Sequence, residues 1–327
     1  MRRRNRRCIA LLGLWAAAAI AAEAPAWKPQ ENVQIIVGAG PGGGNDNVAR
    51  LVQRILQDKR LLEVAATVVN KGGGGGSLAY GYLNQHQASG SYIAVASNTL
   101  LTSHITGIGA LNYTDFTPLA IMINEYISFA VRSDSALKTG RDLIAKLKSD
   151  PAAVAFGIST TLGNINHISV ATVARATGID PKRLKIVVFD SSASSITALL
   201  GGHVDVVAGP PSISANHVEA GKLRIIGVTA PQRLRGVLAD QPTWREQGVD
   251  AVVINWRGLL GAKGIGPRQV AFWDTRLSQL AKSDEWDRDL ARNLWENTFT
   301  DSRGSAQYLK TQYADLKRIL TELGFVK

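Results

Sequence analysis

Short apolar runs and amphipathic segments alternate along most of the chain. The runs are bounded by Gly, Asn, Asp or Ser, which predicts β-strands at 33–37, 65–69, 92–96, 153–157, 185–189, 204–208, 223–229 and 252–260. Between the first two runs, the apolar residues of 47–57 recur at helical spacing. Asn45 or Asp46 stands where the N-cap of that helix is expected.

This alternation predicts an α/β fold in which mostly parallel sheets are flanked by helices. The pattern occurs twice over, and a length of 327 residues favours about two domains. In open sheets of this kind, ligands bind at the carboxyl ends of the strands. A last helical block, 267–323, is expected to pack back on the first domain.

Residues 1–26 have the features of an export signal. Arginines gather in 1–7, an apolar run covers 9–22, and small residues follow. The run is short for a bilayer span, which needs roughly 20 residues. We therefore predict a signal peptide that is cleaved between Ala21 and Ala26. Because Arg6-Arg7 also resembles a twin-arginine signal, both export routes stay open.

Composition limits the chemistry of the mature chain. A hydrophobic content of 45% and a charged content of 19% are those of a globular protein. Cys8 is the single cysteine and lies in the predicted signal, so a disulfide or a cysteine metal site is not expected. Without residues 1–26, the basic count falls from 37 to 32 and the acidic count from 26 to 25. This surplus of basic residues is compatible with an anionic ligand, but a generally basic surface explains it equally well.

Familiar catalytic motifs are missing. The sequence has no G-x-S-x-G, H-E-x-x-H, C-x-x-C or Walker lysine, and its histidines lack ligand-like spacing. We therefore expect a protein that is not an enzyme and that holds no cofactor or metal.

A glycine-rich loop follows the first predicted strand. Gly38, Gly40 and Gly43 spell G-x-G-x-x-G between a strand and a helix, which raises the alternative of a twin-arginine-exported NAD(P)-dependent oxidoreductase. That fingerprint also needs an acidic residue at the end of the next strand, where this chain has Asn70. A loop of this kind can also bind an anion other than a nucleotide, including a carboxylate, because it offers backbone N–H groups and a helix N-terminus.

The same arrangement recurs at other strand ends. Residues 70–77 read N-K-G-G-G-G-G-S after the second strand, and Ser97, Asn98 and Thr99 follow the third. In the second half, small polar stretches at 157–167, 189–193 and 208–212 also follow strands. So many small polar groups at strand ends favour a site that binds rather than reacts.

The order of these motifs resembles the periplasmic solute-binding components of tripartite tricarboxylate transporters, the Bug-type receptors. The resemblance covers nearly the whole mature chain and lies in the export signal and in sequence boxes at 41–50, 70–76, 113–118, 157–167, 199–205, 220–224, 242–243 and 256–258.

The resemblance implies a two-domain periplasmic binding protein fold of type II, which closes by a hinge on a small organic acid. It implies a periplasmic location, delivery of the acid to a membrane permease of that type or signalling to a sensor kinase, and a monomer that binds no nucleic acid. The chain would cross between domains near 123–129 and return near 225–229, giving domain 1 at 27–125 and 228–327 and domain 2 at 126–227.

The predicted ligand-binding residues lie in loops of both domains. Asp46 is expected to cap its helix and pin the loop, whereas His167 and Asp205 are expected to be structural. The first domain would supply Gly42, Gly43, Gly44, Asn45, Asp46, Gly73, Gly74, Gly75, Gly76, Ser77, Ser97, Asn98 and Thr99, and the second Ser159, Thr160, Gly163, Asn164, Ser191, Ser192 and Ala193.

Three positions depart from the family pattern. The family usually has a tyrosine, a glycine and a proline where this chain has Phe189, Ser191 and Gly72, and Asp190 adds a charge beside the first two. The expected ligand is therefore an organic acid, with dicarboxylates, aromatic acids and amino-bearing acids all open.

Overall fold

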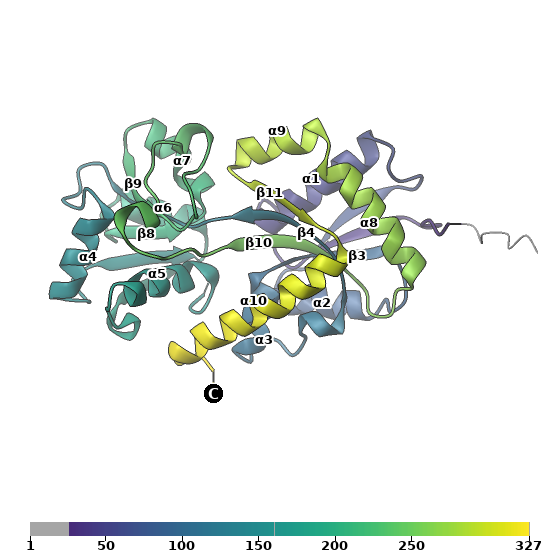
Figure 1. Ribbon diagram of the computed structural model, residues 1–327, viewed down its shortest axis with the longest axis horizontal. Helices are drawn as coiled ribbons and strands as arrows, with labels where there is room; N and C mark the ends of the chain where they lie inside the picture. The colour runs from purple at the N-terminus through teal and green to yellow at the C-terminus, as the bar shows by residue number, and fades with distance from the viewer. Residues whose placement is uncertain (1–25, 160, 327) are drawn as a thin grey trace, which may run out of the picture.

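The computed structural model describes residues 26–159 and 161–326, which form two lobes, each built on its own sheet (Figure 1). The first sheet has the order β11-β4-β10-β3-β1-β2 and the second the order β7-β6-β8-β5-β9. The long strands β4 (Thr117–Glu125) and β10 (Asn255–Gly261) extend from the first sheet toward the second lobe.

The first domain contains both ends of the described chain. Its remaining elements are β1 (Val33–Val37), α1 (Gly44–Asp58), β2 (Ala66–Asn70), η1 (Gly74–Gly76), α2 (Ser77–Asn84), β3 (Tyr92–Ser97), α3 (Asn98–Ile105), η2 (Tyr113–Asp115), α8 (Pro267–Ala281), α9 (Asp284–Asn293), β11 (Glu296–Thr300) and α10 (Ser302–Glu322).

The second domain is the smaller one. Its elements are β5 (Ser128–Arg132), α4 (Gly140–Ser149), β6 (Ala155–Ser159), α5 (Ile165–Ala176), η3 (Pro181–Arg183), β7 (Lys185–Phe189), α6 (Ser192–Leu200), β8 (Val206–Gly209), α7 (Pro211–Glu219) and β9 (Leu223–Val228), followed by η4 (Gly236–Leu238) and η5 (Arg245–Gln247).

Both sheets are mixed, although a mostly parallel order was the expectation. In the first sheet β1 runs parallel to β2 and β3, but β10 runs antiparallel to β3 and β4. In the second, β6 runs parallel to β7 and β8, whereas β5 runs antiparallel to β8 and β9. The antiparallel pairs β4–β10 and β5–β9 belong to the strands that carry the chain between domains, since an outgoing and a returning strand run in opposite directions, whereas β11 pairs antiparallel with β4 within the first domain.

Three chain segments meet where the domains join, and Thr229 holds them together. Its backbone exchanges hydrogen bonds with Ile127 and Val253, while its hydroxyl accepts from Ile127 N at 2.9 Å and donates to Val253 O at 3.0 Å. The Thr229 side chain is fully buried, so its two polar contacts stabilise the crossing.

The segment between β9 and β10 packs mainly on the second sheet. Trp244 contacts Phe129 edge to face at 5.0 Å between ring centroids, and Val249 and Ala251 join the same hydrophobic core. We propose that the return to the first domain lies near 253–255, later than the predicted 227/228 division.

Part of the predicted helical block is a strand. Residues Glu296–Thr300 form β11, which pairs with β4 at the edge of the first sheet. The surrounding helices pack on that sheet as expected, with Trp273, Trp286 and Leu309 in its core. The end of α10 instead reaches the second domain, where Glu322 forms an ion pair with Arg175 of α5.

Candidate functional site

The carboxyl ends of β1, β2 and β3 lie side by side. In the parallel register Val37 pairs with both Asn70 and Val95, so the loops that follow these strands start at one edge of the sheet. A Cβ atom built on Gly38 would lie 2.8 Å from Gly76 Cα. The two glycine loops are therefore in direct backbone contact.

The first glycine loop is held by Asp46, although not as an N-cap. The N-cap of α1 is Gly43, which makes no side-chain cap hydrogen bond, and Asp46 lies in the first turn. One Asp46 oxygen accepts from Gly42 N at 2.8 Å and the other accepts from Asn70 Nδ2 at 2.9 Å. The expected pinning of the loop is present, whereas the expected N-cap role of Asn45 or Asp46 is wrong because the helix starts before both.

The charge of Asp46 is stabilised although its side chain is buried. Burial by itself raises the pKa of the carboxyl, but hydrogen bonds from Arg50, Gly42 and Asn70 outweigh it and hold the pKa below its ordinary value. Arg50 Nε lies 2.8 Å from the carboxylate. A dinucleotide fingerprint needs an acidic residue at the position of Asn70. Here the Asn70 side chain instead donates a hydrogen bond to Asp46 and so helps to hold the first glycine loop.

The second glycine loop adopts a backbone that only glycine takes readily. Gly73, Gly74, Gly75 and Gly76 all have positive φ, between 55° and 123°. The loop continues into η1 and α2, where Gly76 is the N-cap of α2. The glycine run is therefore a defined turn, and not a flexible linker.

These loops present backbone donors without side chains in the way. Gly44, Asn45 and Asp46 are the first three residues of α1, and none of their N–H groups has a hydrogen-bond acceptor among the described residues. The same holds for the N–H groups of Gly73–Gly75 within residues 26–159 and 161–326. Two groups of free amide donors thus lie on touching loops, which suits an anion.

The third strand end contributes less than expected. Ser97 is buried and its hydroxyl accepts from Asn45 Nδ2 at 3.5 Å, which links β3 to the first loop. Asn98 is also buried, and its amide bonds Ile254 O and Trp256 N at 3.2 and 3.1 Å. The Asn98 side chain therefore joins α3 to β10. Of the three residues predicted at this strand end, Ser97 and Asn98 are buried and Thr99 is exposed.

In the second domain, Ser159 connects the predicted loops. Its hydroxyl lies 3.1 Å from Ser192 Oγ at the start of α6 and accepts from Asn166 Nδ2 at 3.0 Å. Asn164 is the N-cap of α5, and Ser191 is the N-cap of α6. Ala193 lies exposed in the first turn of α6, whereas Thr160 falls outside the described residues.

His167 holds the loop that precedes α5. Its Nδ1 accepts a hydrogen bond from Gly163 N at 3.0 Å, and its ring contacts Phe325 edge to face at 5.4 Å. Burial lowers the pKa of the imidazole to about 4, so the ring is neutral at neutral pH. The histidine expected to be structural thus holds the αL turn at Gly163, where φ is 79°.

The sequence analysis did not predict a buried ion pair that lies beside the carboxyl end of β3. Arg257 on β10 stands opposite Ser97 in the register, and its Nη1 donates to Glu125 Oε2 at 2.9 Å. Arg257 Nε also donates to Asn45 Oδ1 at 3.1 Å, so the cation touches the first glycine loop. Two signals existed, namely a charged residue inside the apolar run 252–260 and its place in the box at 256–258.

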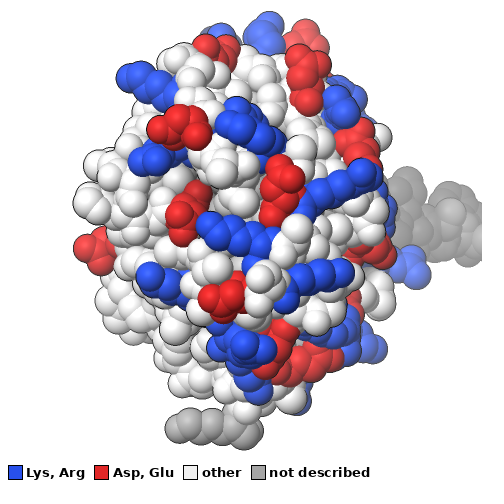
Figure 2. Space-filling view, turned by 90° about the vertical axis from the view of Figure 1, so that its left-hand side faces the viewer, with Lys and Arg blue, Asp and Glu red and all other residues white. Residues whose placement is uncertain are grey.

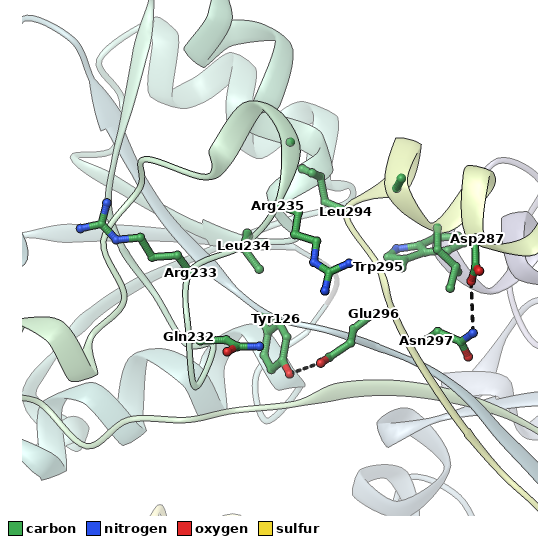
Figure 3. Close-up of a pocket in the computed structure, with 13 residues that line it drawn as sticks. Tyr126, Gln232, Arg233, Leu234, Arg235, Asp287, Leu294, Trp295, Glu296 and Asn297 are labelled. Atoms are coloured by element: carbon green, nitrogen blue, oxygen red, sulfur yellow. Dashed lines mark hydrogen bonds between the residues drawn. The ribbon is translucent and has the colours of Figure 1, made fainter.

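A separate cavity of about 450 Å³ lies between the domains (Figure 3). Arg235 extends into it from the second-domain side, and Tyr126 donates to Glu296 at 2.5 Å across it. None of the predicted ligand residues lines it. It shares one wall with the ion pair, because Trp295 lines the cavity and donates its indole N–H to Glu125 Oε1 at 3.0 Å.

The surface and side-chain inventory adds further limits. Figure 2 shows Lys and Arg interspersed with Asp and Glu over the end of the second lobe, so the basic surplus forms no single-sign patch on this face. Within residues 26–159 and 161–326, no group of three or more His, Cys, Asp or Glu is placed to hold a metal ion. In the same part of the chain, no helix has both the length and the apolar character needed to cross a bilayer.

Sequence comparisons agree with this architecture. The family model described as "Tripartite tricarboxylate transporter family receptor" matches residues 48–325. The UPF0065 protein in the gbd 5' region of Cupriavidus necator is 27% identical over 322 residues, which cover 97% of this chain and 94% of that protein. Protein BugT of Bordetella pertussis is 26% identical over 285 residues, which cover 85% of each chain.

Solved structures share the fold. The R. palustris protein Rpa4515, solved with adipate, superposes with a TM-score of 0.79 at 22% identity and covers 90% of this chain and 98% of its own. MatC from Rhodopseudomonas palustris, solved with bound malate, gives a TM-score of 0.74 at 21% identity, covering 89% and 99%. These comparisons do not support the dehydrogenase alternative.

Proposed function

Because this chain belongs to the tripartite tricarboxylate transporter receptor family, we propose that it captures a small organic acid between its two domains and delivers it to a membrane transporter of that type. The observation that carries the proposal is the contact between two glycine loops with free backbone donors. A carboxylate there would receive N–H groups from both loops and from the N-terminus of α1.

The ligand class follows from the same chemistry. The donors are backbone amides, which bind a carboxylate without requiring a particular carbon skeleton. Adipate in Rpa4515 and malate in MatC, two proteins of the same fold, are both dicarboxylic acids. We therefore propose a small organic acid, with one carboxylate at the glycine loops and the remainder toward Ser159, Ser192 and the adjoining second-domain loops.

Phe189 shapes the distal end of this site. A Cβ built on Gly157 would lie 3.2 Å from the Phe189 ring, so the ring packs over β6 where the family usually has a tyrosine. Without a phenolic hydroxyl, the second domain offers the ligand the hydroxyl groups of Ser159 and Ser192. An acid with an apolar or hydroxylated distal half suits this wall better than one that needs a phenolic donor.

The proposed role is capture without catalysis. Ser159, the most central hydroxyl of the second-domain loops, bonds Ser192 and Asn166, and neither residue is a base that could activate it. We propose in addition that residues 1–26 direct export and are removed, that the mature protein works as a periplasmic monomer, and that closure of the domains on the acid is what the permease recognises.

A binding panel tests this function directly. Isothermal titration of residues 27–327 with malate, adipate, citrate, benzoate, aspartate and NAD should give saturable binding with at least one acid and none with NAD. The diamides of malate and adipate serve as neutral controls and should bind at least tenfold more weakly. Binding of NAD alone would refute the receptor and revive the dehydrogenase alternative.

Transport can be separated from signalling in cells. A strain without this receptor should lose uptake of the labelled acid and regain it when the protein is restored. Normal uptake, together with loss of an acid-induced transcriptional response, would assign the receptor to a sensor kinase instead.

A further inference from the structure

Arg257 has one hydrogen-bonding group without a protein partner. The residue is only 6% exposed. Its Nε and Nη1 are bound by Asn45 and Glu125, but its Nη2 donates to no residue in the described part of the chain. Nη2 is not one of the fully buried side-chain atoms that lack a partner, so this end of the guanidinium group is open to solvent and to a ligand.

The free nitrogen is directed at the first glycine loop. A Cβ atom built on Gly44, the first residue of α1, would lie 2.3 Å from Arg257 Nη2. The guanidinium therefore lies against the helix N-terminus, whose first N–H groups also lack acceptors among residues 26–159 and 161–326. A guanidinium group whose charge is partly compensated by Glu125 thus meets the positive end of a helix dipole, and an anion there would interact favourably with its free N–H and with the dipole.

Glu125 keeps the cation buried before any ligand arrives. Its Oε2 accepts from Arg257 and from Asn255 Nδ2 at 3.0 Å, and its Oε1 accepts from the Trp295 indole. The Arg257 guanidinium also lies over the Trp295 ring, with 5.7 Å from Cζ to the ring centroid. Both Glu125 oxygens are therefore already bonded, Oε2 to Nη1 and not to Nη2, and the free Nη2 stays available to a ligand.

From this geometry, and resting on the function proposed above, we propose that Arg257 is a ligand-binding residue. Its Nη2 donates a charge-assisted hydrogen bond to one carboxylate oxygen of the bound acid at the N-terminus of α1. The backbone amides of the glycine loops hold the other oxygen. The first-domain half of the site then selects an ionised carboxylate by charge as well as by backbone donors.

The test compares variants with carboxylate probes. Isothermal titration would use adipate and malate on the wild-type protein, on Arg257→Met, and on Arg257→Met combined with Glu125→Gln, which avoids an unpaired buried carboxylate. Loss of one charge-assisted bond should raise the dissociation constant by about 10- to 100-fold. Arg268→Met, which removes an exposed arginine on α8, should leave it unchanged.

A second comparison separates ligand contact from support of the loop. Asn45→Ala removes the side chain that Arg257 Nε holds and leaves the cation in place. We expect this variant to weaken adipate binding severalfold less than loss of Arg257 does. An equal loss in both variants would mean that Arg257 acts only by positioning Asn45, and would overturn the proposal.

The remaining outcomes distinguish the two proposals. Wild-type affinity in the folded double variant would overturn the role of Arg257 and leave the receptor function standing. If the wild-type protein bound no acid of the panel, the receptor function itself would fail, and the role of Arg257 with it.

Discussion

Gly38 and Gly76 touch through their backbones. A Cβ on Gly38 would lie 2.8 Å from Gly76 Cα, a distance that no side-chain rotation can relieve, because the obstructing atom belongs to the main chain. This contact fixes the two glycine loops relative to each other. The proposed carboxylate site depends on it, since each loop supplies part of the donor set.

Gly38→Ala should therefore separate the loops. We expect the free energy of unfolding to fall by about 1–3 kcal/mol, the usual cost of overpacking a close contact, and acid binding to weaken. Urea denaturation followed by circular dichroism measures the first effect.

Gly40→Ala is the matched control, because no atom lies within 4 Å of a Cβ built there. It should change the unfolding free energy by less than about 0.5 kcal/mol. Equal denaturation midpoints for the two variants would contradict the proposed loop contact.

Asp46→Ala should loosen the first glycine loop. The change removes a buried carboxylate, leaves Gly42 N without its acceptor, and takes from Asn70 Nδ2 and Arg50 Nε the hydrogen bond each makes to Asp46, although Asn70 Nδ2 keeps Ala39 O. We expect a loss of about 2–3 kcal/mol in unfolding free energy and weaker acid binding by a protein that still folds, which denaturation and titration would measure.

Asp134→Ala provides the comparison for Asp46. Its side chain is 74% exposed and pairs with Arg132 at the surface, so its removal should cost less than about 0.5 kcal/mol. A loss for Asp46→Ala that is no larger would show that the loop does not rely on this carboxylate.

Ser159→Ala tests the second-domain half of the site. The change removes the hydroxyl that joins Ser192 and Asn166. We expect acid binding to weaken about 3- to 10-fold, the size of one neutral hydrogen bond, with the circular dichroism spectrum unchanged.

Thr275→Ala, an exposed hydroxyl on α8, should leave the affinity as it is. If Ser159→Ala bound the acid as tightly as the parent, the second-domain contacts would have to lie elsewhere.

Acid should destabilise the protein through His167. The pKa of about 4 in the folded chain lies below the ordinary 6.5 of the unfolded chain, so between these values the unfolded chain binds more protons. Stability is therefore complete above pH 6.5 and is lost as the pH falls toward 4, by about 3 kcal/mol from this group. Urea denaturation across this range measures the loss.

His167→Asn should flatten that pH dependence, because an amide oxygen can accept from Gly163 N without titrating. His203→Asn, at an exposed histidine, should keep the wild-type slope. Parallel curves for all three proteins would mean that the acid sensitivity has another source.

The sequence predicted several elements closely and missed others for identifiable reasons. β1 and β7 begin and end at the predicted residues, because each is a short apolar run with polar limits. β4 and β5 were not among the predicted strands: only the crossing between domains near 123–129 was expected there, although most of 117–132 is apolar. β11 is short and largely polar, and it is a strand because the edge of β4 is available to it.

The sequence by itself determined the local chemistry of the loops. Only consecutive glycines allow positive φ at Gly73–Gly76 at little cost, so the local sequence determines the backbone of the second donor-rich turn. The strand order then made it predictable that this turn would lie beside the first one. Both inferences use short-range pattern and the geometry of parallel strands, which the chain fixes locally.

Only the tertiary structure decided that a buried cation stands beside these loops. Arg257 and Glu125 are 132 positions apart, and Arg257 and Asn45 are 212 apart. Hydrophobic periodicity places a residue on a strand, but it carries no information about which distant side chain faces it. The pairing depends on β10 lying between β3 and β4, because that register brings the guanidinium group, the carboxylate and the helix N-terminus to one edge of the sheet.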